Sequence, residues 1–179
     1  MELLKVPILQ NGKEKTLIEK VYNINDFPYD EIGHCDIKYK RKGKRTFRYI
    51  NTPIAFDIEC TTLEKYRDNG DRYGEGFMYH WQLCLDNKVV FGRRWEEFTT
   101  FTTRLIKARD KAFPNIVVII PIFVHNLSYE FQFIKDFFKW ENVFCKQKHK
   151  VIYARTDSNI EFRCSFFLSN MSLQKMCEN

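Results

Sequence analysis

Two acidic residues in one short apolar segment, Asp57 and Glu59, are the first candidates for chemistry. Residues 53–62 are typical of a buried strand, because large apolar side chains alternate there with smaller or polar ones. Side chains two positions apart on a strand point to the same face, so the two carboxylates should lie side by side. Adjacent carboxylates repel each other, and a divalent cation is the simplest compensation. The alternative is a strand end whose acids point into water.

A third acid, Glu130, follows a second apolar segment. Residues 115–124 are almost continuously apolar, as expected of a strand that is covered on both faces. After this segment the apolar period becomes helical, and Asn126 or Ser128 is available as the cap. Glu130 falls in the first turn, so it should overhang the end of the preceding strand, where open α/β sheets form ligand crevices. The predicted apolar stripe of the helix consists of Leu127, Phe131, Ile134 and Phe138.

The order and spacing of these segments resemble a known family. Asp57-Ile58-Glu59, followed by residues 125–131, resembles the first and second exonuclease motifs of family B DNA polymerases, above all the protein-primed polymerases of phages and linear plasmids. The likeness extends from about Thr52 onward. It implies an α/β fold with an RNase H-like mixed sheet, in which an antiparallel hairpin and parallel strands are flanked by helices. We therefore expect an exonuclease domain over residues 52–179 and an N-terminal extension over residues 1–51.

The resemblance also implies an activity. Members of the family carry a DEDD 3′→5′ exonuclease that proofreads single-stranded DNA ends by two-metal hydrolysis. Asp57, Glu59 and Glu130 would be the catalytic carboxylates and would hold two Mg²⁺ or Mn²⁺ ions, one to activate the attacking water and one to steady the leaving 3′ oxygen. The residues that would contact the frayed strand are His125, Asn126, Tyr129 and Thr61.

The sequence departs from the family pattern at three points. Glu130 replaces the usual aspartate of the second motif, and Cys60 replaces the threonine that usually follows the first. The third motif, a Tyr-x-x-x-Asp on a helix, is not recognised, and we expect the domain to be truncated before it. The matches Tyr22 to Asp26 and Tyr153 to Asp157 are interpreted as coincidences. The alternative function is therefore a catalytically weak or inactive module that binds DNA or another protein.

A strongly basic segment precedes the first motif. Residues 37–50 contain seven basic residues and no acid, and aromatic residues alternate with cations on both sides of Gly43. This pattern predicts a hairpin that follows a phosphate backbone and stacks bases on Tyr39, Phe47 or Tyr49. The other interpretation is a solvated edge hairpin. The candidate nucleic-acid contacts are Lys38, Lys40, Arg41, Lys42, Lys44 and Arg45.

Composition limits the location and the partners of the protein. The chain has 179 residues and a formal net charge of +6, which suits an anionic partner. Its six cysteines form no C-x-x-C pair and fit a reducing compartment. We expect a cytoplasmic protein, in the host cytoplasm if viral, with no membrane contact. The expected partners are single-stranded DNA or a primer 3′ end, and a downstream polymerase portion or a replication protein.

The remaining elements are predicted from local patterns. We expect a loop over residues 64–76 near the active crevice and a hairpin of residues 78–85 and 88–92. Helical spacing predicts a helix from Trp95 to Ala112. Short strands are predicted at 143–145, 151–155 and 160–167, a helix is predicted to begin at residue 172, and an N-terminal hairpin is predicted to turn at Asn11 and Gly12.

Overall fold

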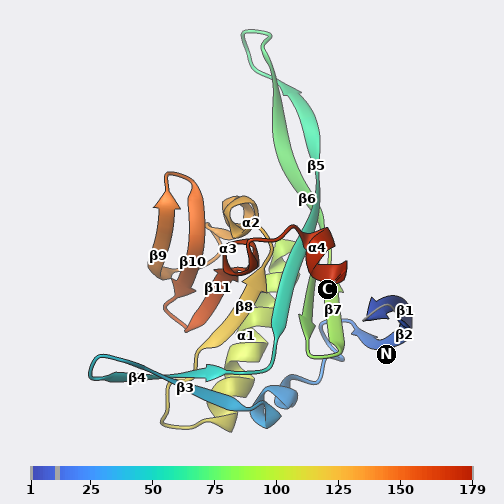
Figure 1. Ribbon diagram of the computed structural model, residues 1–179. Helices are drawn as coiled ribbons and strands as arrows, with labels where there is room; N and C mark the ends of the chain where they lie inside the picture. The colour runs from blue at the N-terminus through green and yellow to red at the C-terminus, as the bar shows by residue number, and fades with distance from the viewer. Residues whose placement is uncertain (1, 11–12, 179) are drawn as a thin grey trace.

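A nine-stranded mixed sheet forms the body of the protein, in a computed structural model that describes residues 2–10 and 13–178 (Figure 1). The order of its strands is β1-β2-β7-β6-β5-β8-β11-β10-β9. The predicted turn at Asn11 and Gly12 lies outside the described residues. The fold is therefore mixed α/β, as the sequence predicts.

The five central strands combine antiparallel and parallel pairing. In the order β7-β6-β5 neighbours are antiparallel, whereas β8 and β11 run parallel to β5. The predicted hairpin of residues 78–85 and 88–92 is confirmed as part of this unit. The bounds of the five strands are Ile54–Tyr66 for β5, Arg72–Leu85 for β6, Lys88–Gly92 for β7, Ile120–Val124 for β8 and Ile160–Cys164 for β11.

The outer strands extend this sheet on both sides. The N-terminal hairpin joins it because β2 pairs in parallel with β7, and β9 and β10 form an antiparallel hairpin against β11. A separate two-stranded sheet contains β3 and β4, the predicted basic hairpin. The bounds are Glu2–Gln10 for β1, Lys13–Tyr22 for β2, Ile37–Lys42 for β3, Arg45–Ile50 for β4, Trp140–Gln147 for β9 and Lys150–Thr156 for β10.

Helices cover the two faces of the sheet unequally. The long helix α1, Trp95–Ala112, lies behind the sheet in Figure 1 and packs its apolar side on it, with Phe98 stacked on Phe56 at 4.6 Å between ring centroids. The short helices α3 and α4 lie in front of the sheet, and we call this front side the open face. The bounds of the four short helical segments are Tyr29–His34 for η1, Leu127–Ile134 for α2, Ser165–Ser169 for α3 and Leu173–Glu178 for α4.

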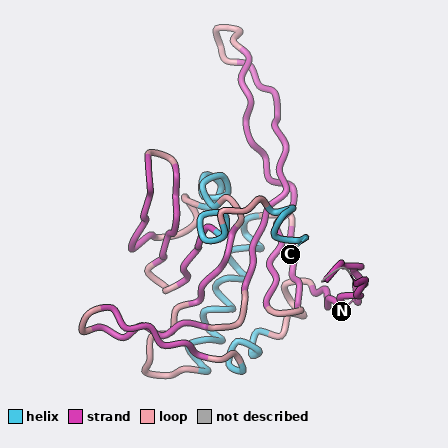
Figure 2. The backbone as a smooth tube through the Cα atoms, viewed as in Figure 1, coloured by secondary structure: helices cyan, strands magenta, loops and turns pink. Residues whose placement is uncertain are grey.

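Only the tip of the predicted loop, residues 67–71, is irregular, so the prediction of a loop over residues 64–76 is mostly wrong. These residues continue β5 and β6 into a long hairpin, paired from Cys60 with Met78 to Tyr66 with Arg72, which projects beyond the sheet (Figure 2). Ion pairs of Lys65 with Glu75 and of Arg72 with Glu64 join the two strands. Charged and glycine residues resemble a loop in sequence, but here cross-strand pairs of opposite charge support a solvated ribbon.

Three predicted boundaries shift. The apolar run at 115–124 becomes a strand only from Ile120, because Ile116 and Val117 are 42% and 60% exposed. Helix α2 ends at Ile134, so Phe138 lies beyond it. Strand β11 ends at Cys164, and the predicted strand residues that follow form α3 instead. The helix from Trp95 to Ala112 is confirmed.

Candidate carboxylate site

Asp57 and Glu59 lie on the open face of the central strand. Ile54, Phe56 and Ile58 are buried, whereas the residues between them are more exposed, so the alternation predicted from sequence is confirmed. The pairing of β5 with β6 shifts directly after Glu59, where a bulge begins the projecting hairpin. The bulge marks the point at which β5 leaves the body of the sheet.

Asp57 lines a pocket of about 390 Å³. Strands β5, β6 and β8 form its floor, and helices α3 and α4 contribute to its wall. Gln82 is the partner of Asp57 in the strand register, so that register could have identified it from the predicted hairpin. Ser165 and Leu173 carry no comparable signal, since they reach the pocket only through the tertiary fold. The side chains that shape the pocket around Asp57 are Ala55, Gln82, Phe123, His125, Ser165 and Leu173.

Glu130 is buried in the first turn of α2. It is 5% exposed, and its Oε2 atom has no hydrogen-bond partner. Burial and, to a smaller degree, the nearby charge of Asp57 together raise the pKa of Glu130 to about 7. The register of Phe56 with Val124 explains this proximity, because it sets Asp57 beside the strand end from which α2 starts. Asp57 therefore lies near enough to Glu130 for its charge to act on the Glu130 carboxyl group.

Glu59 faces a different environment from Asp57. It lines a neighbouring pocket of about 560 Å³ together with Phe77, Tyr79, His80 and Arg93. Across the described residues, the structure gathers no group of three or more His, Cys, Asp or Glu side chains suited to hold a metal ion. The charge of Asp57 acts on Glu130, whereas Glu59 lines a pocket of its own, so the three predicted catalytic carboxylates do not converge on one point of the described structure.

The residues fit a divalent cation in part. A buried carboxylate oxygen without a hydrogen bond, next to a second carboxylate, is a site at which a cation or a proton must supply the missing compensation. Carboxylate oxygens are the ligands that Mg²⁺ and Mn²⁺ prefer. One ion held by Asp57 and Glu130 therefore fits the structure. A second ion that needs Glu59 does not find its ligands gathered.

His125 and Asn126, which are predicted to contact the DNA strand, lie where β8 ends and α2 begins. His125 reaches Ser165, with 3.2 Å between Nδ1 and Oγ, and its ring meets that of Phe166 edge to face. Asn126 occupies the N-cap position in a left-handed conformation with φ of 60°, but its side chain does not cap the helix. Of the two predicted cap residues, Asn126 and Ser128, it is thus Asn126 that holds the N-cap position, without a side-chain bond to the first turn.

Tyr129 and Thr61 lie at the base of the projecting hairpin. The Tyr129 hydroxyl lies 2.7 Å from Sγ of Cys60, and this hydrogen bond raises the pKa of Tyr129 to about 12. Tyr129 remains 47% exposed and packs edge to face on Phe133. Thr61 is exposed on β5 beyond the bulge. Tyr129 therefore lies beside Glu130, and neither Tyr129 nor Thr61 lines the pocket of Asp57.

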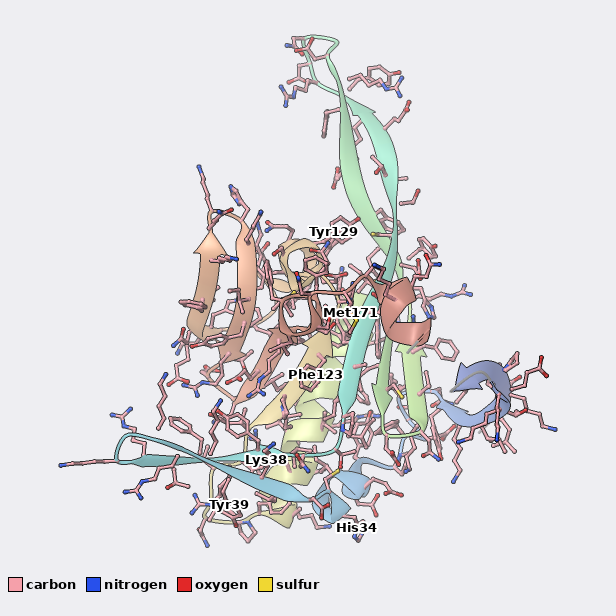
Figure 3. All side chains as sticks on the ribbon, viewed as in Figure 1. His34, Lys38, Tyr39, Phe123, Tyr129 and Met171 are labelled. Atoms are coloured by element: carbon pink, nitrogen blue, oxygen red, sulfur yellow. The ribbon has the colours of Figure 1, made fainter. Side chains whose placement is uncertain are left out.

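Two other sequence features lie away from the carboxylates. The basic hairpin leaves the sheet at its opposite end, and Figure 3 shows Lys38 and Tyr39 far from Tyr129. Neither Tyr-x-x-x-Asp match lies on a helix. Tyr22 ends β2, and Tyr153 belongs to β10. Both matches therefore lack the helical setting of the third motif.

Comparisons with known proteins give one partial similarity to report. The chain is 27% identical over 120 residues to nuclear egress protein 2 of Alcelaphine herpesvirus 1 (strain C500). The matched segment is 67% of this chain but only 45% of that protein. No protein-family profile matches the chain, and no solved structure matches it. In the described part of the chain, no helix is both long and apolar enough to cross a membrane.

Proposed function

We propose that this protein is a metal-dependent 3′→5′ exonuclease domain with an RNase H-like fold, similar to the proofreading domain of family B DNA polymerases. The order β7-β6-β5-β8-β11, with three antiparallel strands followed by two parallel ones, is the arrangement expected of such a sheet. Asp57 and Glu130 lie near the end of β8, beside β5, and the carboxyl ends of parallel strands are the usual position of a site in an open α/β sheet.

The observation that carries this proposal is the unpartnered Oε2 atom of Glu130 beside Asp57. An ionised carboxylate is costly to bury without compensation. Without a cation, a bound proton neutralises the Glu130 carboxylate, and this preference for the protonated form raises its pKa to about 7. A divalent cation would replace the proton and relieve the repulsion from Asp57 at the same time.

The pocket of Asp57 is suited to a terminal nucleotide. Phe123 and Leu173 provide apolar surface for a base or sugar, while Gln82 and Ser165 provide hydrogen-bonding groups. His125, fixed by Ser165, would orient the strand end toward Asp57. A divalent cation bound by Asp57 and Glu130 would supply a water of lowered pKa and stabilise charge on the phosphate.

A second candidate function is nucleic-acid or protein binding without catalysis. It is favoured by the separate pocket of Glu59 and by the lack of a converging group of three metal ligands in the described structure. An assay of strand hydrolysis distinguishes the two functions, because only the first requires Asp57 for cleavage of a phosphodiester bond.

The test follows a 5′-labelled single strand in the presence of Mn²⁺. We expect the parent protein to shorten the strand from its 3′ end and Asp57→Asn to stop this reaction. Asp68→Asn is the matched control, since Asp68 is exposed at the tip of the projecting hairpin. A parent protein that binds the strand without shortening it would support the second function. Equal cleavage by the parent and by Asp57→Asn would show that the activity belongs elsewhere.

A further inference from the structure

The β3–β4 hairpin is anchored at its base and free at its tip. Backbone hydrogen bonds join Ile50 N to Ile119 O at 3.0 Å and Ile119 N to Arg48 O at 2.8 Å, which ties the hairpin to the residue before β8. Its turn contains Gly43 in a left-handed conformation, with φ of 60°. The hairpin therefore holds a fixed position next to the sheet while most of its length is exposed (Figure 1).

The charge of this hairpin is not neutralised within the protein. In the described structure, none of its seven cations forms an ion pair. The projecting β5–β6 hairpin differs, because Lys65 and Arg72 both pair with a glutamate of the neighbouring strand. The positive charge of the β3–β4 hairpin is thus available to an external anion.

The strand register divides these cations between two faces of the hairpin. Directly opposed residues share a face, and the face alternates along each strand. The first face, which we call the lysine face, contains Lys38, Lys40, Lys42, Arg45, Phe47 and Tyr49. The opposite face contains Ile37, Tyr39, Arg41, Thr46, Arg48 and Ile50.

The base of the opposite face is engaged with the body of the protein. Ile50 is buried in the core, and Ile37 packs against the core. The guanidinium of Arg48 lies over the ring of Tyr39, 5.8 Å from its centroid. The lysine face combines four cations with the partly exposed ring of Phe47, which no cation covers among the described contacts.

We propose that the lysine face binds single-stranded nucleic acid. Lys38, Lys40 and Lys42 recur at every second residue, about 7 Å apart, so they can pair with successive phosphates of an extended strand. Phe47 offers a ring on which an unpaired base stacks. A single strand fits better than a duplex, because its bases are free to reach that ring.

The lysine face leads to the open face of the main sheet. The guanidinium of Arg163 lies 4.8 Å from the centroid of the Tyr49 ring. Arg163 is the register partner of Phe123, which is in turn the partner of Ala55, two residues before Asp57. Figure 3 shows Phe123 between Lys38 and Tyr129. The route from Tyr49 to Asp57 rests on the proposed function, whereas binding at the lysine face does not.

The test measures fluorescence anisotropy of a 5′-fluorescein-labelled oligothymidylate in EDTA, which prevents hydrolysis. Two double variants remove the same charge from different faces: Lys40→Ala with Lys42→Ala, and Arg41→Ala with Arg48→Ala. We expect the first to weaken binding roughly 20-fold at 0.1 M salt and to lower the salt slope by about 1.4, at 0.7 per phosphate contact. The second should weaken binding much less. Phe47→Ala should weaken binding, and Tyr39→Ala is its control.

Several results would overturn this inference. Equal losses in the two double variants would show that only the total charge matters. An affinity that does not change with salt would also contradict binding of phosphates at the lysine face. Tighter binding to phosphatidylserine vesicles than to the oligonucleotide would indicate a membrane surface as the partner instead. Binding that persists in Asp57→Asn, or in a protein without hydrolytic activity, supports the lysine face and separates its outcome from that of the proposed exonuclease.

Discussion

The carboxylate site and the β3–β4 hairpin carry opposite charges under different degrees of burial. Glu130 is buried with an unpartnered oxygen beside Asp57, whereas the cations of the hairpin are mostly exposed and form no ion pair in the described structure. Both regions lack a compensating charge of their own. The buried one is costly to keep ionised, while solvent screens the exposed one at little cost.

This difference assigns each region its own experimental signature. A buried carboxylate should respond to pH and to divalent cations and little to salt, because a proton or a bound ion is its only compensation. An exposed basic face should respond strongly to salt and little to pH, because mobile ions compete for its partner. A carboxylate site that responds mainly to salt, or a basic face that responds mainly to pH, would contradict this assignment.

The largest expected effect is the pH dependence of stability caused by Glu130. Its pKa of about 7 in the folded protein exceeds its ordinary value of 4.5. Between these values the folded state binds more protons than the unfolded state, so the free energy of unfolding falls as pH rises through this window. The fall is at most about 3 kcal/mol, and it is complete above the folded pKa.

The variant Glu130→Gln should abolish this dependence in metal-free buffer. The amide has its own cost in the buried site, but that cost does not change with pH. Urea unfolding between pH 4.5 and 8 measures the effect, with exposed Glu96→Gln as the control. Parallel pH profiles for the parent and Glu130→Gln would show that Glu130 titrates normally.

The second effect is the salt dependence of binding at the lysine face. Four phosphate contacts, made by Lys38, Lys40, Lys42 and Arg45, correspond to a slope of about −2.8 in log affinity against log salt for a single strand. Raising salt from 50 to 200 mM should therefore weaken oligothymidylate binding roughly 50-fold. Anisotropy titrations measure this loss, and changing pH from 6 to 8 should leave the affinity nearly constant.

The smallest effect is expected in the projecting β5–β6 hairpin. Lys65 pairs with Glu75 across the strands, but about half of each side chain is exposed. Such exposed pairs contribute little to the free energy of unfolding, because water screens the charges. Glu75→Gln should therefore change the midpoint of thermal unfolding only slightly and leave oligothymidylate binding unaltered. A large loss of oligothymidylate binding in Glu75→Gln would show that the β5–β6 hairpin contacts the oligonucleotide instead.

Local patterns predicted the parts of the fold that depend on neighbouring residues. Alternation set Asp57 and Glu59 on one face, and helical spacing identified α1. The same reasoning placed Glu130 over the end of β8, because the change of period fixes where the helix begins. Each of these features follows from the periodicity of one continuous segment.

Features that depend on distant segments were beyond such reasoning. Ser165 and Leu173 reach the pocket of Asp57 only after the chain has crossed the sheet. Residues 64–76 have the composition of a loop, but ion pairs between opposite strands support them as part of the β5–β6 hairpin. Val117 is apolar but exposed, so its side chain does not mark a strand. Asp57 and Glu59 likewise line different pockets because of side chains that distant segments contribute around each of them.

Thermal unfolding in a Mn²⁺ series at pH 7.5 tests most directly whether Asp57 and Glu130 form a cation site. An ion that binds only the folded state stabilises it by mass action, by about 2.7 kcal/mol at a concentration of 100 times Kd. For a chain of this size the midpoint should rise by roughly 5–10 °C. We predict this rise for the parent and for Glu96→Gln, and its loss in Asp57→Asn and Glu130→Gln. An equal rise in all four proteins, or none in the parent, would contradict the account.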